Sequence, residues 1–352
     1  MTASAVHSAP RARPAAAAPM LTPGRVVLHA IPWLLVIAAY VALPDYLTLG
    51  TNVLIMILFA LSLEIALGYA GIVSLGHAAF YGVGAYAAGI CAIHFTNEPL
   101  LGLLFATAVA AVFGLVTGAL ILHTQGMTLM MLTLAVAALI AEAANQAHAL
   151  TGGDDGLQLP ALKPLLGLFK FDLWGHTAYL YAGAVLLVWF LLSWRIVRSP
   201  FGRSVNGIRQ NPRRMRAIGA PVWRRLVAAY GLSAAMAGTA GALSAQATGS
   251  VGIASLSLLT SGTVLMVLVL GGMRRLYGAF VGAVVYVVVQ DLAAELDPFR
   301  WMFVIGGLLM ASVLFFENGL MSIVDIVGRA RTSRKSPPAC GPDRGPAPKV
   351  TP

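Results

Sequence analysis

Two carboxylates lie inside apolar segments of the sequence, and this position restricts the chemistry open to them. Glu64 and Glu142 are each flanked on both sides by aliphatic residues. A charge inside a bilayer costs roughly 3 kcal/mol or more unless it is paired or hydrated. Glu64 therefore faces an amino group, holds a proton or reaches water near a helix end, and the sequence leaves these three interpretations open. For Glu142, which lies near the end of its segment, solvation at the membrane surface is the simpler interpretation.

The histidine residues show no spacing that is typical of a metal site. His77, His94 and His148 do not form the His-x-x-x-His pattern, which places two imidazoles on one face of a helix. We therefore expect no metal in this chain, because ordinary hydrogen bonds account for these side chains.

A glycine-rich run from Gly68 to Gly82 separates the second apolar segment from the third. Glycine interrupts a helix and exposes backbone N–H and C=O groups, which a membrane tolerates only against protein or a watery cavity. The run is therefore a candidate substrate pathway. Spacing alone favours the competing interpretation, close helix packing, which the pairs Gly114/Gly118 and Gly278/Gly282 also indicate. The candidate pathway residues are Glu64, Gly71, Ser74, Gly76 and His77.

A short motif in this run recurs later in the chain. Ala-Gly-x-Val-Ser at Ala70–Ser74 returns loosely as Ala-Gly-x-Leu-Ser at Ala240–Ser244. The copies belong to the second and seventh apolar segments, which have opposite orientations in an alternating bundle. An inverted-topology repeat with a site at its interface produces such a relationship, although five residues also match by chance.

Nine arginines and no carboxylate occur between Arg195 and Arg225, with membrane-length apolar segments on both sides. Positive charge resists translocation across an energised membrane, so this loop is predicted to stay on the cytoplasmic side. Anionic lipid alone is one possible partner of such a loop.

The arginine loop also has the pattern of two short amphipathic helices. One is expected near Ser204–Gln210 and the other near Arg213–Ile218, with Pro212 between them and Gly219 at the end. A rigid helix that projects from a membrane bundle can transmit force from a soluble motor protein. We therefore favour docking of a partner over lipid contact alone.

The composition excludes an ordinary soluble domain. The chain has 352 residues, 59% hydrophobic and only 10% charged, and its mean hydropathy is +0.82. Its apolar segments are long and continuous rather than alternating, so we predict an all-α integral membrane protein and not a barrel. A polytopic bundle of about ten transmembrane helices is expected, with a count accurate to one or two. The predicted segments are Val26–Leu43, Thr51–Leu67, Ile72–Ile93, Leu100–Leu122, Met127–Gln146, Ala178–Trp194, Leu226–Ala247, Leu258–Met273, Leu276–Gln290 and Arg300–Phe316.

Charge predicts the orientation of this bundle. With a cytoplasmic N-terminus, all but three of the 23 Lys and Arg residues fall on the cytoplasmic side, the exceptions being Lys163, Lys170 and Arg300. Both termini are then cytoplasmic. The net charge of +10 is a topology signal and does not indicate nucleic-acid binding. We expect disordered ends at residues 1–25 and 326–352, and a membrane domain at 26–325 that contains the cytoplasmic loop 195–225.

The predicted outer loop that follows the fifth segment contains a tight acidic turn at Thr151–Gly156. Asp154 and Asp155 are candidate contacts to an external protein. Physical reasoning alone favours a solvated turn whose glycines serve only the backbone.

Four stretches of the chain resemble branched-chain amino acid ABC transporter permeases of the LivM type. They are Gly71–Tyr86, Thr151–Leu157, Phe201–Gly219 and Val269–Gly282, which occur in the family's order and at suitable spacing. The resemblance covers most of Thr51–Val324 and implies the ABC importer permease fold.

This resemblance implies a subunit of the bacterial cytoplasmic (inner) membrane that pairs with a related, LivH-type permease. An extracytoplasmic substrate-binding protein would deliver a small amino acid, and two ATPase subunits would drive transport. No Gly-x-x-x-x-Gly-Lys-Ser/Thr loop occurs, so ATP is expected on the partner subunits, and this chain is expected to be neither an enzyme nor a cofactor-binding protein. By match to the family's cytoplasmic segment, the candidate ATPase-coupling residues are Arg203, Arg209, Arg213 and Gly219.

Some positions depart from the family pattern, which affects substrate recognition and docking. Glu64 replaces a usual asparagine, and Arg274 a usual glycine. Ile253 and Ala254 replace a common Pro-acidic pair, and Glu317 and Asn318 a common Pro-Arg.

Three alternatives remain open from the sequence. An ABC importer of the same type for urea or short amides has similar motifs, because few contacts set the substrate specificity. An ion-coupled secondary transporter would use Glu64 and Glu142 as proton carriers and need no ATPase. A passive channel would never accumulate its solute.

Overall fold

The computed structural model describes residues 23–42, 44–160, 163–164, 175–297 and 301–315. The predicted terminal segments lie outside this part except for residues 23–25, so their disorder stays a prediction. Other residues named above that lie outside it are Lys170, Arg300, Glu317 and Asn318.

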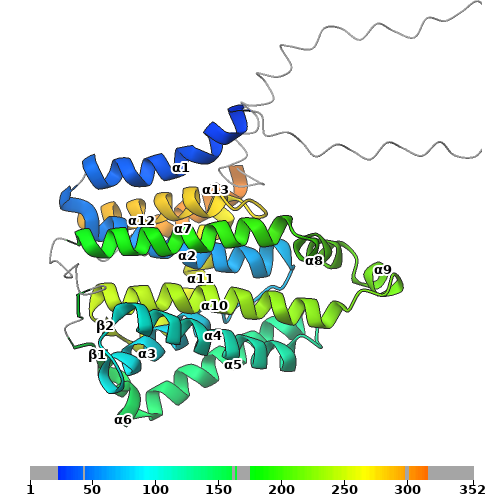
Figure 1. Cartoon of the computed structure of the whole chain (residues 1–352), viewed down its shortest axis with the longest axis horizontal. Coiled ribbons are helices and arrows are strands. Elements are labelled where there is room, and N and C mark those ends of the chain that lie inside the picture. The colour runs from blue at the N-terminus through cyan, green and yellow to red at the C-terminus, as the bar shows by residue number, and fades with distance from the viewer. Residues whose placement is uncertain (1–22, 43, 161–162, 165–174, 298–300, 316–352) are drawn as a thin grey trace, which may run out of the picture.

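Each of the ten predicted apolar segments overlaps one helix of the structure (Figure 1). The helices run roughly along one axis and form a single bundle. Their bounds are α1 Pro23–Ala42, α2 Leu47–Leu63, α3 Ala78–His94, α4 Pro99–Ile121, α5 Met127–Gln146, α7 His176–Arg198, α10 Val222–Thr248, α11 Leu258–Gly271, α12 Gly278–Leu296 and α13 Trp301–Phe315.

Short elements join these helices. A π-helical turn at Glu64–Tyr69 extends α2, and 3₁₀ turns occupy Pro44–Tyr46, Gly153–Asp155 and Ile253–Leu256. The remaining elements are α6 His148–Thr151, β1 Leu157–Gln158, α8 Pro200–Gln210, α9 Pro212–Ala217 and β2 Ser250–Val251. The antiparallel pair β1 and β2 ties the loop after α5 to the loop after α10.

Six helical segments of the described residues have the length and hydropathy to cross a membrane. They are Pro44–Tyr69, Pro99–Ile121, Met127–Gln146, His176–Arg198, Val222–Thr248 and Gly278–Leu296. Three further apolar helical stretches, at Pro32–Ala42, Ala78–His94 and Leu258–Gly271, are shorter. The chain is therefore a multi-pass, all-α membrane protein, and the number of ten spans stays a prediction.

The helix α10 forms the centre of the bundle and packs against α2, α3 and α4. Small residues make this possible, because a Cβ added at Gly84 would overlap the backbone of Gly238, and one added at Gly241 would overlap the carbonyl oxygen of Tyr81. The predicted glycine pairs also serve packing: Gly114 and Gly118 lie against Ala234 and Tyr230 of α10. Close approach of backbones therefore defines the core.

Two helix boundaries differ from the prediction more than the others do. The sequence predicts the third segment from Ile72, but α3 begins at Ala78, after Gly71 has adopted a φ of 74°. The Ala78 N–H donates a hydrogen bond to the Ser261 hydroxyl oxygen of α11 at 2.9 Å, which stabilises the start of α3. The ninth segment is predicted to end at Gln290, but α12 continues to Leu296 because residues 292–296 are strong helix formers.

The two copies of the Ala-Gly-x-(Val/Leu)-Ser motif adopt different backbone conformations. Ala70–Ser74 lies in the irregular segment between the π-helical turn and α3, whereas Ala240–Ser244 lies within α10. The motif therefore does not mark equivalent local structures, and the inverted repeat stays a prediction without support from these segments.

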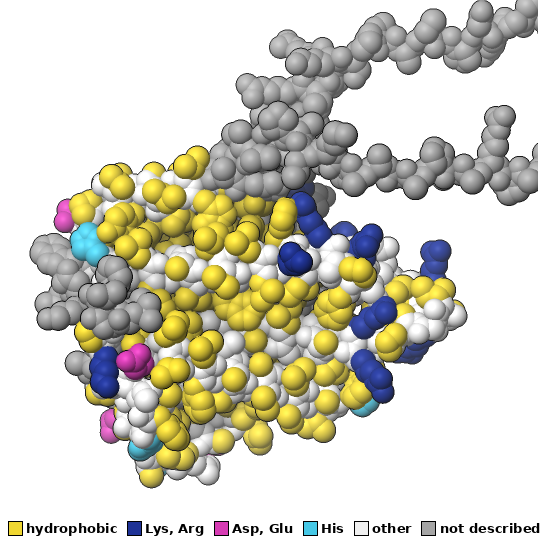
Figure 2. Space-filling model, in the orientation of Figure 1, with side chains coloured by type: hydrophobic (Ala, Val, Ile, Leu, Met, Phe, Trp, Pro, Cys, Tyr) yellow, Lys and Arg dark blue, Asp and Glu magenta, His cyan; other side chains and the backbone are white. Residues whose placement is uncertain are grey.

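Charge divides the described bundle into two ends (Figure 2). The arginines gather around α8 and α9, which we call the basic end, and the acidic side chains lie around β1 and β2 at the opposite, acidic end. Among the described residues, Glu64 is the only carboxylate near the basic end. The carboxylates nearer the acidic end are Asp45, Glu98, Glu142, Asp154, Asp155, Asp291, Glu295 and Asp297.

Candidate functional site

The glycine-rich run forms a break in the bundle, as the sequence predicts. The Ala70 N–H donates to the Ile65 carbonyl at 3.1 Å, and the Ile72 N–H donates to the Ala66 carbonyl at 2.9 Å. These hydrogen bonds span more residues than those of an α-helix, so the helix is wider here before the chain leaves it. Gly71 permits this turn through its positive φ. Residues 72–77 then follow without helical structure.

Glu64 opens the π-helical turn and is 0% exposed. Its carboxyl group fits against Gly68, where any side chain would overlap it. The charges of Arg209 and Arg274 act on the carboxylate, but the effect of burial is larger. Neither carboxylate oxygen has a partner with regular hydrogen-bond geometry among the described residues. Charge from two other elements therefore offsets the burial of Glu64 only in part.

His77 and Ser62 form a buried polar pair beside the break. The Ser62 hydroxyl donates to the Phe59 carbonyl at 2.6 Å, so its oxygen accepts from His77 Nε2 at 2.8 Å. This assignment leaves His77 Nδ1 as the unprotonated nitrogen, without a hydrogen-bond partner among the described residues. The imidazole also stacks on Phe59, with ring centroids 5.8 Å apart.

Removal of the Ser62 hydroxyl is expected to destabilise the protein by about 1–3 kcal/mol, because a buried His77 N–H loses its acceptor. The measurement is the free energy of unfolding of Ser62→Ala in detergent. Ser255→Ala, which removes a hydroxyl bonded at the surface to the Gly252 carbonyl, is the matched control. Equal stability of the two variants would contradict the assigned hydrogen bond.

The remaining predicted pathway residues have different surroundings. Ser74 is 3% exposed. Gly76 packs against the backbone of Thr133 in α5, whose hydroxyl accepts from the Leu75 N–H at 3.2 Å, so this glycine serves packing. Gly71 alone of the five is exposed. The structure brings Glu64 and Gly71 together at the basic end of the break, with His77 deeper in the bundle.

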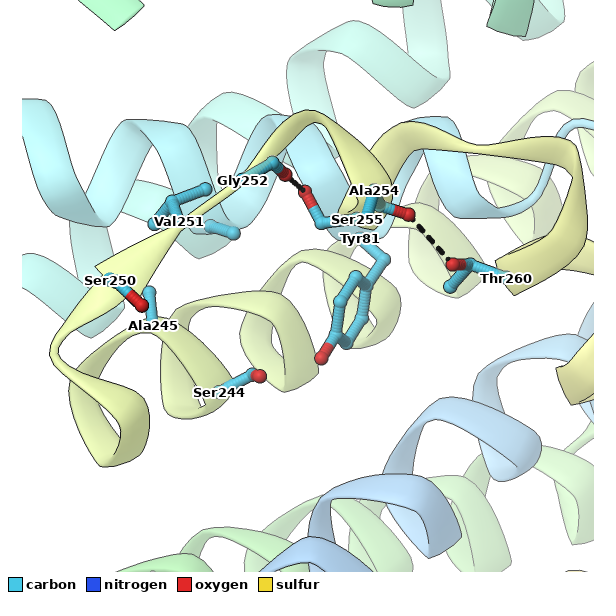
Figure 3. Close-up of a pocket in the computed structure, with 10 residues that line it drawn as sticks. Tyr81, Ser244, Ala245, Ser250, Val251, Gly252, Ala254, Ser255 and Thr260 are labelled. Carbon is cyan, nitrogen blue, oxygen red and sulfur yellow. Dashed lines mark hydrogen bonds between the residues drawn. The ribbon is translucent and has the colours of Figure 1, made fainter. Parts of the chain in front are cut away.

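Two cavities of about 330 and about 280 Å³ lie nearer the acidic end, and both are lined by Tyr81, Ser244 and Thr260. In the smaller one, Tyr81 points toward Ser244 and the Thr260 hydroxyl donates to the Ala254 carbonyl at 2.8 Å (Figure 3). None of the five predicted pathway residues lines either cavity. The larger cavity is also lined by Leu49, Asn52, Ile55, Met56, Phe59, Val287, Gln290, Asp291 and Ala294.

The larger cavity is lined by both polar and apolar side chains. Asn52, Gln290 and Asp291 supply amide and carboxylate groups, and α2 supplies aliphatic and aromatic side chains. Phe59 connects it to the predicted site, because this ring lines the cavity and stacks on His77. The cavity was not predicted from the sequence. Asp291 was not predicted either, because the predicted ninth segment ends at Gln290, one residue before it. A carboxylate inside an apolar helix was the available signal.

Two short helices, α8 and α9, occupy the arginine loop as predicted, and α8 has a buried apolar face, whereas no residue of α9 is buried. Ser199 caps α8 by accepting from the Gly202 N–H at 3.3 Å, and Asn211 caps α9 by accepting from the Arg214 N–H at 3.0 Å. Val205 and Ile208 turn the apolar face of α8 into the bundle. The loop is therefore helical and not irregular, and α8 is the part of it that is anchored in the bundle.

The candidate coupling residues divide into two groups. Arg203, Arg213 and Gly219 are exposed, and Gly219 has a φ of 79° with open space beside its Cα. Arg209 is half-buried, and its side chain lies against Gly71, whose added Cβ would be 2.7 Å from Arg209 Cγ. Three of the four thus face outward, whereas Arg209 faces the break.

The acidic turn lies at the opposite end of the bundle. Asp154 and Asp155 are exposed in a 3₁₀ turn between α6 and β1. Thr151 stabilises this turn by donating to the Ala144 carbonyl at 2.5 Å and accepting from the Gly153 N–H at 3.3 Å. Positive φ at Gly152, Gly153 and Gly156 explains the need for glycine.

Comparison with known proteins identifies the protein family. Residues 46–313 match the family model described as the permease component of the branched-chain amino acid transport system. The chain belongs to this family. The permease is therefore a transport subunit of an ABC importer in the inner membrane and is not itself an enzyme.

Curated relatives agree with this membership. The permease is 29% identical to the high-affinity branched-chain amino acid transport system permease protein LivM of Salmonella typhimurium and 28% identical to that of Escherichia coli, in both cases over 78% of this chain and 69% of the relative. A probable LivM of Methanocaldococcus jannaschii is 24% identical over 74% of this chain and 89% of the relative. No solved structure matches the chain.

Proposed function

We propose that the permease forms, together with a second, related permease, the membrane pathway of an ATP-driven importer for leucine, isoleucine and valine. The family match across residues 46–313 carries this proposal. In it the chain crosses the membrane ten times, both termini are cytoplasmic, and the basic end of the bundle faces the cytoplasm, as the arginine distribution favours. ATP is bound by partner ATPase subunits, and no cofactor is needed in this chain.

The larger cavity is our candidate for the substrate contact. A branched-chain amino acid carries a charged ammonium group and a charged carboxylate group on its α-carbon, and it has an aliphatic side chain. The cavity offers Asn52, Gln290 and Asp291 to the charged groups and the apolar side chains of α2 to the aliphatic one. Asp291 is exposed on α12. Since an exposed carboxylate in lipid is costly, this face favours a second permease or a hydrated pathway over lipid. Movement of the break around Gly71, Ser74, Gly76 and His77 would open the pathway toward the cytoplasm.

The partner surfaces follow from the two charged ends. The α8–α9 pair is the proposed docking surface for the ATPase subunits, with Arg203, Arg213 and Gly219 outside and Arg209 on the inner side. Asp154 and Asp155 are the proposed contacts for the substrate-binding protein. Membrane lipid covers the apolar sides of the bundle.

Charge reversal at Arg213 is expected to lower ATP-driven uptake at least about tenfold, because an exposed arginine that docks a partner becomes repulsive. The measurement is uptake by Arg213→Glu together with capture of the ATPase subunits. Arg213→Lys keeps the charge and is the control. Full uptake by Arg213→Glu would show that Arg213 does not belong to the docking surface.

The transport assay tests the function itself. Cells with and without the gene receive labelled leucine, valine or urea at low concentration, with ATP depletion in one arm and an uncoupler in another. We expect ATP-dependent accumulation of leucine and valine above equilibrium. A response of urea alone would change the substrate to a short amide, and uptake that stops with the uncoupler while ATP persists would replace the importer by a secondary transporter. Uptake that never exceeds equilibrium would indicate a channel.

A further inference from the structure

Two helices of the permease, α2 and α12, supply most of the lining of the larger cavity, each with one face. The lining residues recur at intervals of three and four along both helices, as residues on one helix face do. They are Leu49, Asn52, Ile55, Met56 and Phe59 on α2 and Val287, Gln290, Asp291 and Ala294 on α12. The two helices run in opposite directions, because α2 begins at the acidic end of the bundle and α12 ends there.

The amides and the carboxylate of these two helices lie at nearly the same depth. Asn52 follows Leu47, the first residue of α2, by five positions, and Asp291 precedes Leu296, the last residue of α12, by five. At a rise of about 1.5 Å per residue, both lie about 8 Å from the acidic end of their helix. The lining residues deeper than Gln290 on these two helices are all apolar, namely Ile55, Met56, Phe59 and Val287. The cavity therefore offers polar groups nearer the acidic end and apolar groups farther in.

The charge of the cavity comes from one residue. Among the described residues, Asp291 is the only charged side chain that lines either cavity. A carboxylate with no cation beside it attracts a cationic group and repels an anionic one. The other polar groups of the larger cavity are neutral amides and hydroxyls, on Asn52, Tyr81, Ser244, Thr260 and Gln290. Selection by charge in this cavity therefore depends on Asp291.

We propose that Asp291 binds the ammonium group of the transported solute, so that the larger cavity selects solutes with an ammonium group and a short aliphatic chain. The inference rests on the proposed function and deepens it. The ammonium group lies at the level of Asp291, and the aliphatic chain extends toward Phe59 and Val287. A volume of about 330 Å³ is at the lower end of the range for ligand pockets, which suits a small solute. The cavity then requires no carboxylate on the solute, and urea lacks the cation that it requires.

The first experiment measures ATP-driven leucine uptake by the reconstituted complex of permease, partner permease and ATPase subunits, at a limiting concentration of leucine-loaded binding protein. Asp291→Asn keeps the size of the side chain and removes its charge, and it is expected to lower uptake at least about tenfold. Asp291→Glu keeps the charge and is expected to retain most of the uptake. Glu295→Gln removes an exposed carboxylate one turn farther along α12 that lines neither cavity, and it is expected to leave uptake unchanged.

A competition experiment separates recognition of the solute from a structural role of Asp291. Isopentylamine has the aliphatic chain and the ammonium group of leucine without its carboxylate, and isocaproate has the chain and the carboxylate without the ammonium group. Each is added in excess to the unaltered complex at a saturating concentration of leucine-loaded binding protein. We expect isopentylamine to inhibit leucine uptake and isocaproate to have little effect. The leucine content of the binding protein is measured in parallel, so that competition there is recognised.

Each outcome bears on the proposal. Normal uptake by Asp291→Asn overturns it, as does equal loss in Asp291→Asn and Asp291→Glu. Inhibition by isocaproate that equals or exceeds inhibition by isopentylamine also overturns it. A structural defect in Asp291→Asn lowers uptake but leaves the residual uptake sensitive to isopentylamine, whereas the proposal requires this sensitivity to be lost. If Asp291→Asn does not assemble, Asp291→Glu and the competition in the unaltered complex still decide. Absence of ATP-dependent leucine uptake by the unaltered complex would instead refute the proposed function.

Discussion

Replacement of Gly241 by valine is expected to abolish assembly of the permease. A Cβ at this position of α10 would overlap the Tyr81 carbonyl oxygen and press on the Ala85 backbone nitrogen, both in α3. Backbone atoms inside two packed helices cannot move aside as a flexible side chain can, so the helices must separate. Overpacking of this kind costs about 3 kcal/mol or more, a large part of the stability of a typical domain.

Gly262→Ala is the matched control for this prediction. Gly262 also lies within a helix, α11, but an added Cβ meets no atom within 4 Å. Alanine is therefore expected to be tolerated and to stabilise the helix by about 0.5–1 kcal/mol. The measurement is the amount of monodisperse permease extracted from membranes and its melting temperature. A Gly241→Val variant with the yield and melting temperature of the unaltered chain would show that α3 and α10 do not pack as closely as the structure indicates.

The helices were predictable because their signal is local. A continuous apolar run identifies a buried or membrane helix, and all ten predicted runs overlap one. The caps of α8 and α9 were not predicted, although a local signal exists, since Ser199 and Asn211 each precede a proline at the first turn. The boundary at Gln290 was wrong because polarity marks the edge of an apolar run, whereas α12 ends where backbone propensity ends.

The candidate site was less predictable because its parts are distant in the sequence. The break at Gly71 could be predicted from glycine content, but whether Gly76 packs or lines a pathway depends on Thr133, which only the fold places there. Arg274 stands where the resembled family usually has glycine, and its positive φ explains that preference.

Filling the space beside Ser244 is expected to lower leucine uptake at least about tenfold without loss of protein. Ser244 of α10 lines both cavities, opposite Tyr81 (Figure 3), so the larger side chain of Ser244→Leu occupies volume that a substrate needs. In enzymes, misplacement of a bound substrate by about 1 Å strongly lowers the reaction rate. A transport step that requires the solute to fit is expected to slow for the same reason. The measurement is the maximal rate of ATP-dependent uptake at saturating binding protein.

Ala247→Leu adds a side chain of the same size to the same helix, but Ala247 is exposed and lines neither cavity. This variant is expected to transport normally. The complex that contains Ser244→Leu is expected to hydrolyse ATP at the basal rate and to transport little leucine. Ser244→Ala, which keeps the cavity open, separates volume from the hydroxyl group: normal uptake indicates that space is limiting, and reduced uptake indicates that the hydroxyl contacts the solute. If Ser244→Leu and Ala247→Leu transport equally well, the solute does not pass through either cavity, and the pathway must run along the exposed side of the glycine break at Gly71.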